Sequence, residues 1–258
     1  MTAIETHGLA TGYSFPLYNG LDLTLQQGEL VCLLGLNGAG KSTLLKTLCG
    51  FLKPLGGELK IMGNTIDDIH PERLSRTIGM VLTGNSGPGG VTVRELVSMG
   101  RYPHTGFFGK LSPDDRKAVE RAIASAGIPA LADRHLGEIS DGERQKAFIA
   151  KALAQECPII ILDEPTAFLD VTSRMEMMVL LRHLADRENK AVLVSTHDLD
   201  SALQTAHTLW LMEKGAGSGG TVRCGSPDKL AEDGSLSAFF SRGPMKFDPS
   251  SGRLTVSL

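Results

Sequence analysis

The clearest chemical signature in this sequence is a run of eight residues, 35–42, which reads Gly-Leu-Asn-Gly-Ala-Gly-Lys-Ser. The pattern is G-x-x-x-x-G-K-[ST], whose glycines let backbone N–H groups turn around phosphate oxygens at the start of a helix. Lys41 is expected to reach the β- and γ-phosphates of a nucleotide, and the Ser42 hydroxyl to hold Mg²⁺. The residues expected to contact the nucleotide here are Gly35, Asn37, Gly38, Ala39, Gly40, Lys41, Ser42 and Thr43.

Two adjacent carboxylates, Asp163 and Glu164, follow the apolar run 159–162. Acidic residues are rarely buried without a compensating charge, and Mg²⁺ would compensate Asp163. Glu164 is then placed to polarise an attacking water. His197 follows another apolar run, 191–195, and is a candidate partner of the γ-phosphate and of Glu164. Ligands of open α/β sheets collect at the carboxyl ends of the strands, so all these groups are expected to converge.

The elements that must position these residues can be read from the apolar pattern. Runs 30–34, 159–162, 191–195 and 209–212 predict parallel strands covered on both faces, with helices at 173–186 and 199–206 between them. Residues 1–28 instead alternate short strand-like runs, such as 21–25, with turns, which predicts an antiparallel β portion. The pattern therefore predicts an α/β fold class with an N-terminal antiparallel β portion, and the 35–42 motif resembles that of P-loop NTPases, which implies a RecA-like core.

A helical block interrupts this core. The glycine-rich segment 84–90 cannot pack as an element and is expected to act as a hinge. Ser112-Pro113-Asp114-Asp115 predicts one helix start, and Ser140 with Glu143 three residues later forms a capping box at another. The predicted organisation is a nucleotide-binding core of residues 1–83 and 158–214, an inserted helical subdomain of residues 84–157, and a C-terminal appendage of residues 215–258, within one domain of residues 1–258.

The composition is that of a globular protein, with 41% hydrophobic and 21% charged residues over 258 positions and a net charge of −3. No basic block typical of nucleic-acid binding is present, so no nucleic-acid partner is expected. No apolar stretch reaches the 18 residues needed to span a bilayer, and no signal peptide is apparent. The four cysteines form no C-x-x-C pair and are expected to be free, buried thiols.

The segment Ile139-Ser140-Asp141-Gly142-Glu143-Arg144-Gln145 resembles the signature sequence of ATP-binding-cassette (ABC) ATPases. It lies upstream of Glu164 at the far end of the helical block, where that family carries it. Ser140 and Gly142 would offer a hydroxyl and N–H groups at a helix N-terminus, which is a second anion site. If the phosphate loop and this second anion site lie on separate parts of the molecule, one chain cannot bring both onto the same nucleotide. Two copies related by a two-fold axis can do so, each copy contributing one of the two sites.

The resemblance to the ABC family extends over nearly the whole chain and implies further roles. Phe168-Leu169-Asp170 is similar to the family's D-loop, which makes Asp170 a nucleotide-site residue, as Glu143 is in the signature. Tyr13 matches the aromatic residue that stacks on adenine, with Phe15 and Tyr18 as rivals. Thr83 stands where the family has a glutamine near Mg²⁺, so it would act through a water. Asp141 replaces the usual glycine of the signature and is expected to point aside.

The segment Gly100-Arg101-Tyr102-Pro103-His104 resembles the subgroup that energises import of ferric siderophores, haem and cobalamin. That resemblance implies an ATPase using ATP and Mg²⁺ as a homodimer, peripheral to the cytoplasmic face of the cell (inner) membrane. Its partners would be integral membrane permease subunits and, indirectly, a substrate-binding protein. Residues 84–90 and 94–104 are the expected permease contact.

Other function classes compete with this interpretation. DNA-repair members of the family carry long coiled-coil heptads and translation-linked members carry two cassettes, and neither feature is present. A soluble single-cassette ATPase, for example of iron–sulfur cluster assembly, is harder to exclude. A small-molecule P-loop kinase is the third alternative, and it predicts phosphoryl transfer to an acceptor without ATP-dependent dimerisation.

Overall fold

The computed structural model describes residues 1–82, 90–106, 109–167, 169–215, 219–241, 245–248 and 253–256. A 6-stranded sheet crosses its centre. The strand order is β11 (Thr221–Gly225), β10 (Thr208–Glu213), β4 (Leu30–Gly35), β9 (Ala191–Thr196), β8 (Ile159–Asp163) and β7 (Ile78–Val81). All pairs from β10 to β7 are parallel, and β11 is antiparallel to β10.

A second, antiparallel sheet is built mainly from the N-terminal part of the chain, as predicted. It contains β1 (Thr2–Gly12), β2 (Pro16–Leu21), β3 (Thr24–Gln26), β5 (Gly56–Ile61) and β6 (Asn64–Thr65). The single strand predicted at 21–25 is wrong, because the chain breaks between β2 and β3. There the Asp22 carboxylate accepts from the Gly8 N–H at 2.7 Å, and Leu23 donates to the Thr6 hydroxyl. Side-chain hydrogen bonds thus interrupt the strand ladder here, beside a backbone hydrogen bond from the Thr6 N–H to the Leu23 carbonyl at 2.9 Å.

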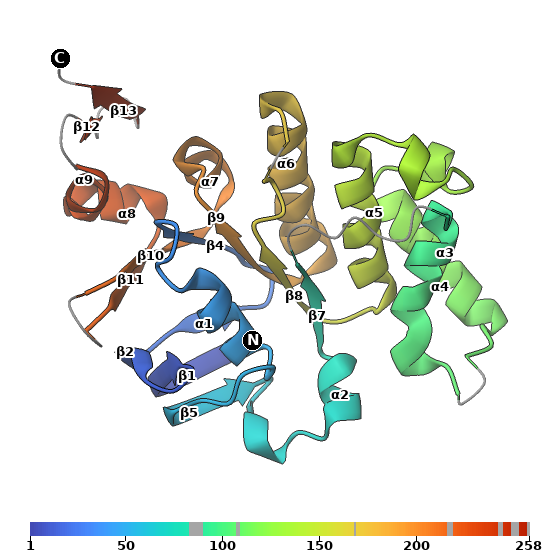
Figure 1. Cartoon of the computed structure of the whole chain (residues 1–258), viewed down its shortest axis with the longest axis horizontal. Coiled ribbons are helices and arrows are strands. Elements are labelled where there is room, and N and C mark those ends of the chain that lie inside the picture. The colour runs from blue at the N-terminus through green and yellow to red at the C-terminus, as the bar shows by residue number, and fades with distance from the viewer. Residues whose placement is uncertain are drawn as a thin grey trace.

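The two faces of the central sheet are both covered, which explains the continuous apolar runs. On β4, Val31 and Leu33 join the core that contains α1 (Lys41–Leu48) and the antiparallel sheet. Leu30, Cys32 and Leu34 point the other way, into the core that contains α6 (Val171–Glu188) and α7 (Leu199–Thr205). Figure 1 shows α1 between the two sheets and α6 and α7 on the opposite side of the central sheet.

The predicted helical block follows β7. It contains α3 (Val93–Ser98), η2 (Met99–His104), α4 (Pro113–Ser125), η3 (Pro129–Leu131), η4 (Leu136–Glu138) and α5 (Asp141–Ala154), while η1 (Ile66–Asp68) and α2 (Pro71–Ser75) precede β7. The N-cap predicted at Ser112 and the capping box predicted at Ser140 are both present, and Ser112 also forms a capping box with Asp115. In Figure 1 this block lies on the far side of α6 and β7 from α1.

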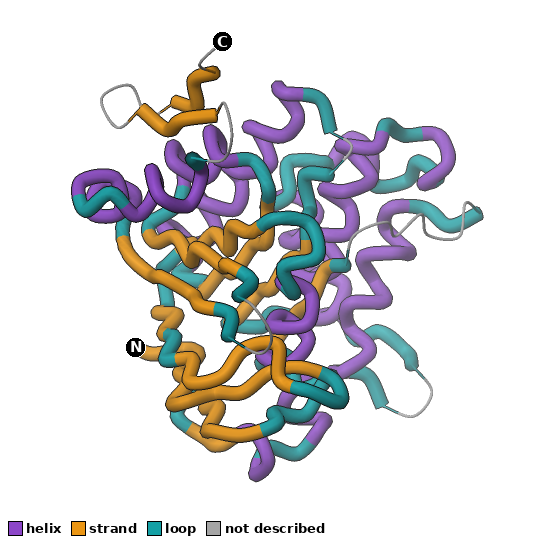
Figure 2. The backbone as a smooth tube through the Cα atoms, turned by 60° about the vertical axis from the view of Figure 1, so that its left-hand side comes forward, coloured by secondary structure: helices purple, strands orange, loops and turns teal. Residues whose placement is uncertain are grey.

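The C-terminal part packs beside the central sheet. It consists of α8 (Pro227–Glu232), α9 (Ser235–Phe240) and a hairpin of β12 (Met245–Asp248) and β13 (Arg253–Val256). Figure 2 shows the hairpin projecting beyond the α8 and α9 end of the molecule. Cys32, Cys49 and Cys157 are buried free thiols, as expected, whereas Cys224 is exposed on β11, because that strand forms the open edge of the sheet.

Candidate functional site

The phosphate loop joins β4 to α1, in the strand–loop–helix context that the motif requires. Gly38 and Gly40 have φ values of +76° and +99°, a region that other residues rarely occupy. Gly40 is the N-cap of α1 and has no side chain, so the first N–H groups of the helix are not occupied by a cap. Asn37, Gly38 and Ser42 are exposed, which leaves the loop open to a ligand. This geometry suits a phosphate group.

Lys41 lies at the centre of the site. Its side chain is only 5% exposed, and its ammonium donates to the Gly35 carbonyl at 2.8 Å. The same nitrogen lies 3.2 Å from Oε1 of Glu164. His197 Nδ1 lies 3.6 Å from the other carboxylate oxygen, Oε2. The structure therefore brings together Lys41, Glu164 and His197, which the sequence placed after three different strands.

Asp163 and Glu164 are positioned by a residue that the sequence analysis missed. Ser195 is fully buried in β9, and its hydroxyl donates to Asp163 Oδ1 at 2.7 Å. The Ser195 hydroxyl oxygen in turn accepts from the Glu164 N–H at 2.9 Å. Glu164 itself has a φ of +46°, a strained conformation for a non-glycine residue that is frequent at functional sites. Ser195 thus fixes both carboxylate residues relative to β9.

The signature residues lie at the start of α5. Ser140 caps this helix by accepting from the Glu143 N–H at 3.3 Å, and its own N–H and hydroxyl donate to Glu143 Oε2 at 2.8 and 2.9 Å. These hydrogen bonds lower the pKa of Glu143, first through the Ser140 N–H and then through its hydroxyl. Asp141 is 67% exposed and pairs with Arg144 of the same helix. A Cβ on Gly142 would lie 3.3 Å from the Ser173 hydroxyl, so Gly142 lies against the start of α6.

Asp170 caps α6 in the same manner, because its carboxylate accepts from the Ser173 N–H at 2.9 Å. This hydrogen bond is the main reason that the pKa of Asp170 is lowered. Asp170 and Gly142 thus meet through Ser173, which connects the predicted D-loop to the predicted signature. Phe168 of the D-loop lies outside the described residues, and so does Thr83, the expected substitute for the glutamine.

The structure separates the three aromatic candidates for adenine stacking. Tyr18 is 1% exposed, so it has no free ring face and is excluded. Tyr13 and Phe15 are 61% and 81% exposed, and both lie on the tight turn between β1 and β2. A Cβ at Gly12 would lie 2.1 Å from the Phe15 carbonyl oxygen, so this turn requires glycine there. Tyr13 stays the predicted stacking residue, with Phe15 as its rival.

Comparisons with known proteins show the family of this chain. Residues 18–167, more than half of the chain, match the family model described as ABC transporter. The chain belongs to the ABC transporter family. It is 41% identical over 211 residues to an ABC transporter ATP-binding protein of Methanocaldococcus jannaschii, covering 81% of this chain and 73% of that protein. It is 40% identical to a siderophore transport system ATP-binding protein of Bacillus subtilis, covering 81% and 76%.

Solved structures of ABC proteins have the same fold. A subunit of an ABC transporter complex from Clostridium perfringens superposes with a TM-score of 0.79 at 28% identity, covering 92% of this chain and 93% of that one. A dimeric bacterial ABC transporter cassette superposes with a TM-score of 0.72 at 26% identity, covering 87% of this chain and 98% of that one. This chain is an ABC transporter ATP-binding subunit, and the cassette family to which it belongs binds ATP or ADP and hydrolyses ATP. Within the part of the chain that is described, no helix is long and apolar enough to cross a membrane.

Proposed function

We propose that this ABC ATPase powers import of an iron chelate, haem or cobalamin, working as a homodimer on integral membrane permease subunits. A substrate-binding protein would deliver the cargo to the permease. The cluster of Lys41, Glu164 and His197 carries the ATP-hydrolysis part of the proposal, because it joins a phosphate-binding group to a general base. Relatives named as ferric enterobactin transport and cobalamin import ATP-binding proteins, from Escherichia coli and Halobacterium salinarum, support the cargo class at 36% and 37% identity.

The residues fit Mg²⁺, which binds through one or two protein oxygens and the substrate phosphates rather than in a protein cage. Ser42 and Asp163 would hold it, and the bound ion would neutralise charge on the phosphates. Lys41 binds the γ-phosphate, and Glu164 accepts a proton from the attacking water. His197 holds Glu164 in place and contacts the γ-phosphate. A partner copy completes the site with Ser140 and Gly142, and loss of the γ-phosphate lets the dimer open.

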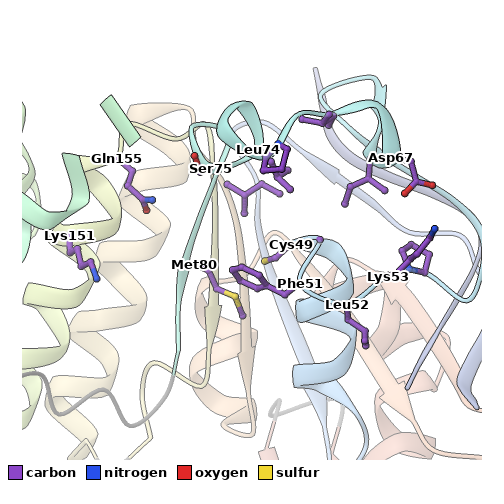
Figure 3. Close-up of a pocket in the computed structure, with 16 residues that line it drawn as sticks. Cys49, Phe51, Leu52, Lys53, Asp67, Leu74, Ser75, Met80, Lys151 and Gln155 are labelled. Atoms are coloured by element: carbon purple, nitrogen blue, oxygen red, sulfur yellow. The ribbon is translucent and has the colours of Figure 1, made fainter. Parts of the chain in front are cut away.

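A groove of about 680 Å³ supports the permease partner. It runs between the end of α1, α2 and the floor strand β7 on one side and α5 on the other (Figure 3). Its wall is largely apolar, and Phe51 is 72% exposed at its centre. Lys53 and Lys151 lie toward its two ends. An amphipathic permease helix with acidic flanks fits these features. Because the groove is lined by residues of the nucleotide-binding core and of the inserted helical block, such a helix would follow the movement of one relative to the other.

The stretch 94–104, where the permease contact was expected, borders this groove rather than lining it. His104 hydrogen bonds to the Gln155 carbonyl at 2.8 Å, and the Arg76 guanidinium donates to the Pro103 carbonyl at 2.8 Å. Arg101 is buried and forms ion pairs with Asp115 at 2.9 Å and Glu156 at 2.7 Å. It therefore stabilises the packing of the inserted helical block. Residues 84–89 of the other expected contact lie outside the described residues.

The proposed docking predicts a specific separation of functions. Phe51→Asp would place a carboxylate in an apolar contact, weakening a central contact by at least about 2 kcal/mol. Recovery of the permease with the tagged variant from detergent should fall by roughly 30-fold, with ATP hydrolysis by the isolated subunit retained. Val179→Asp, on the exposed face of α6, should leave recovery unchanged. Undiminished recovery with Phe51→Asp would exclude this groove.

A soluble iron–sulfur assembly ATPase is not favoured, because the relatives compared above are transport proteins by name. Purification of the native protein in a soluble complex, without any polytopic membrane protein, would reverse this preference.

A further inference from the structure

Tyr18 is a buried polar residue that the proposed reaction does not use. It lies in β2, and its hydroxyl donates to the carbonyl of Ala39 at 2.6 Å. Ala39 is one of the residues of the phosphate loop, and its own N–H donates to the Leu36 carbonyl at 3.0 Å. Burial, with a smaller contribution from Glu213, raises the pKa of Tyr18 to about 12. The hydroxyl therefore remains a donor at any physiological pH.

The Tyr18 ring has almost no freedom to move. A Cβ built on Gly220 would lie 2.3 Å from Cε1 of the ring, which is closer than any real side chain allows. On the other side, a Cβ on Gly40 would lie 3.4 Å from Cε2. Tyr18 and Gly220 also form a parallel β-bridge. The ring thus fills the space between the phosphate loop and the residue that leads into β11.

The direction of the Ala39 carbonyl matters for phosphate binding. A phosphate loop works by turning N–H groups toward the anion, so a carbonyl turned the same way would repel it. In this chain the carbonyl is instead hydrogen-bonded to a hydroxyl on the β2 side of the loop. Because Ala39 is itself buried, that carbonyl would have to find another partner if the hydroxyl were removed.

We propose that Tyr18 is a positioning residue for triphosphate binding, holding the Ala39 carbonyl away from the phosphates, and that Gly220 keeps its ring in place. A residue of β2 and a residue near the C-terminal end of the central sheet therefore control phosphate affinity without touching the nucleotide. The inference depends on the phosphate-loop assignment and is independent of the cargo, the dimer and the permease.

The test compares MgATP with inorganic tripolyphosphate, which has the phosphates but no base. In Tyr18→Phe both ligands should bind roughly 3- to 10-fold more weakly, as expected for one lost hydrogen bond. The rate at saturating ATP should stay within about two-fold, because the residue acts on the loop and not on the water. Gly220→Ala would displace the Tyr18 ring and should weaken the binding of both ligands to a similar extent.

Two control variants separate this effect from others. Tyr102→Phe removes a hydroxyl from an exposed ring and should change the dissociation constant of neither MgATP nor tripolyphosphate. Tyr13→Ala should weaken the binding of ATP but not of tripolyphosphate, since Tyr13 is expected to stack on the adenine base. If Tyr18→Phe lowers the melting temperature while tripolyphosphate binds as in the wild type, Tyr18 is merely structural and the inference is overturned. Equal tripolyphosphate binding in wild type and Gly220→Ala would overturn the role of Gly220.

Discussion

Glu164→Gln should abolish most ATP hydrolysis while ATP binding persists. Glutamine keeps the shape of the side chain and can still accept from Lys41, which lies 3.2 Å from Oε1. It cannot take a proton from water. Removing a positioned base lowers the rate about 10²- to 10⁴-fold, on the order of 3–5 kcal/mol. Because the γ-phosphate is then retained, ATP should trap a dimer on size-exclusion chromatography.

The matched control is Glu176→Gln. Glu176 is an exposed acid on α6 that pairs with Lys146 at 2.8 Å, away from the phosphate loop, so hydrolysis should be unchanged. Hydrolysis at a near wild-type rate in Glu164→Gln would show that another group activates the water. Loss of ATP binding in that variant would instead show that Glu164 holds the nucleotide.

Lys41→Ala should cause the second large effect, on binding. The Lys41 ammonium is nearly enclosed between the Gly35 carbonyl and Glu164, and it is the cation nearest the general base. A hydrogen bond to a charged group contributes about 1.5–3 kcal/mol, so ATP should bind roughly 10- to 150-fold more weakly. Isothermal titration with MgATP measures this change directly.

Lys46→Ala provides the comparison, because Lys46 lies in the last turn of the same helix, α1. Its loss removes the same charge without removing a phosphate ligand, so the affinity should stay within about two-fold. An unchanged dissociation constant in Lys41→Ala would contradict the phosphate-loop assignment, whatever the hydrolysis rate.

Much of this site could be predicted because its parts are local in the sequence. The phosphate loop, the acidic pair after β8, the N-cap at Ser112 and the capping box at Ser140 each depend on residues a few positions apart. The apolar strands were predicted because burial on both faces leaves continuous hydrophobic runs. Their convergence followed from a general property of parallel sheets, in which carboxyl ends share one edge.

The features that were missed depend on contacts between distant residues. Ser195 looks like an ordinary strand residue, and only its position beside Asp163 in the neighbouring strand gives it a role. Tyr18 was a candidate for adenine stacking because its burial could not be read from the nearby sequence. That burial depends partly on Gly220, which is far along the chain. Arg101 belonged to a recognisable motif, yet its partners on α4 and after α5 bury it. The groove has no local signature, because it forms between separate elements.

The central claim is that each active site is shared between two copies, with Lys41 from one and Ser140 from the other. The direct test mixes two variants that each impair one half of the proposed site, Lys41→Ala and Ser140→Arg, and measures ATP hydrolysis at an ATP concentration at which neither variant alone is active. Ser112→Arg, the same change at the capping box of α4, should leave activity intact and controls for loss of a cap.

If the sites are shared, a heterodimer of the two variants contains one site with both defects and one site with none. Random mixing should then restore up to roughly a quarter of the wild-type rate, since about half of the dimers are mixed and each has one working site. If Lys41 and Ser140 serve the same nucleotide within one chain, every site is defective. A mixture no more active than either variant alone would therefore contradict the account.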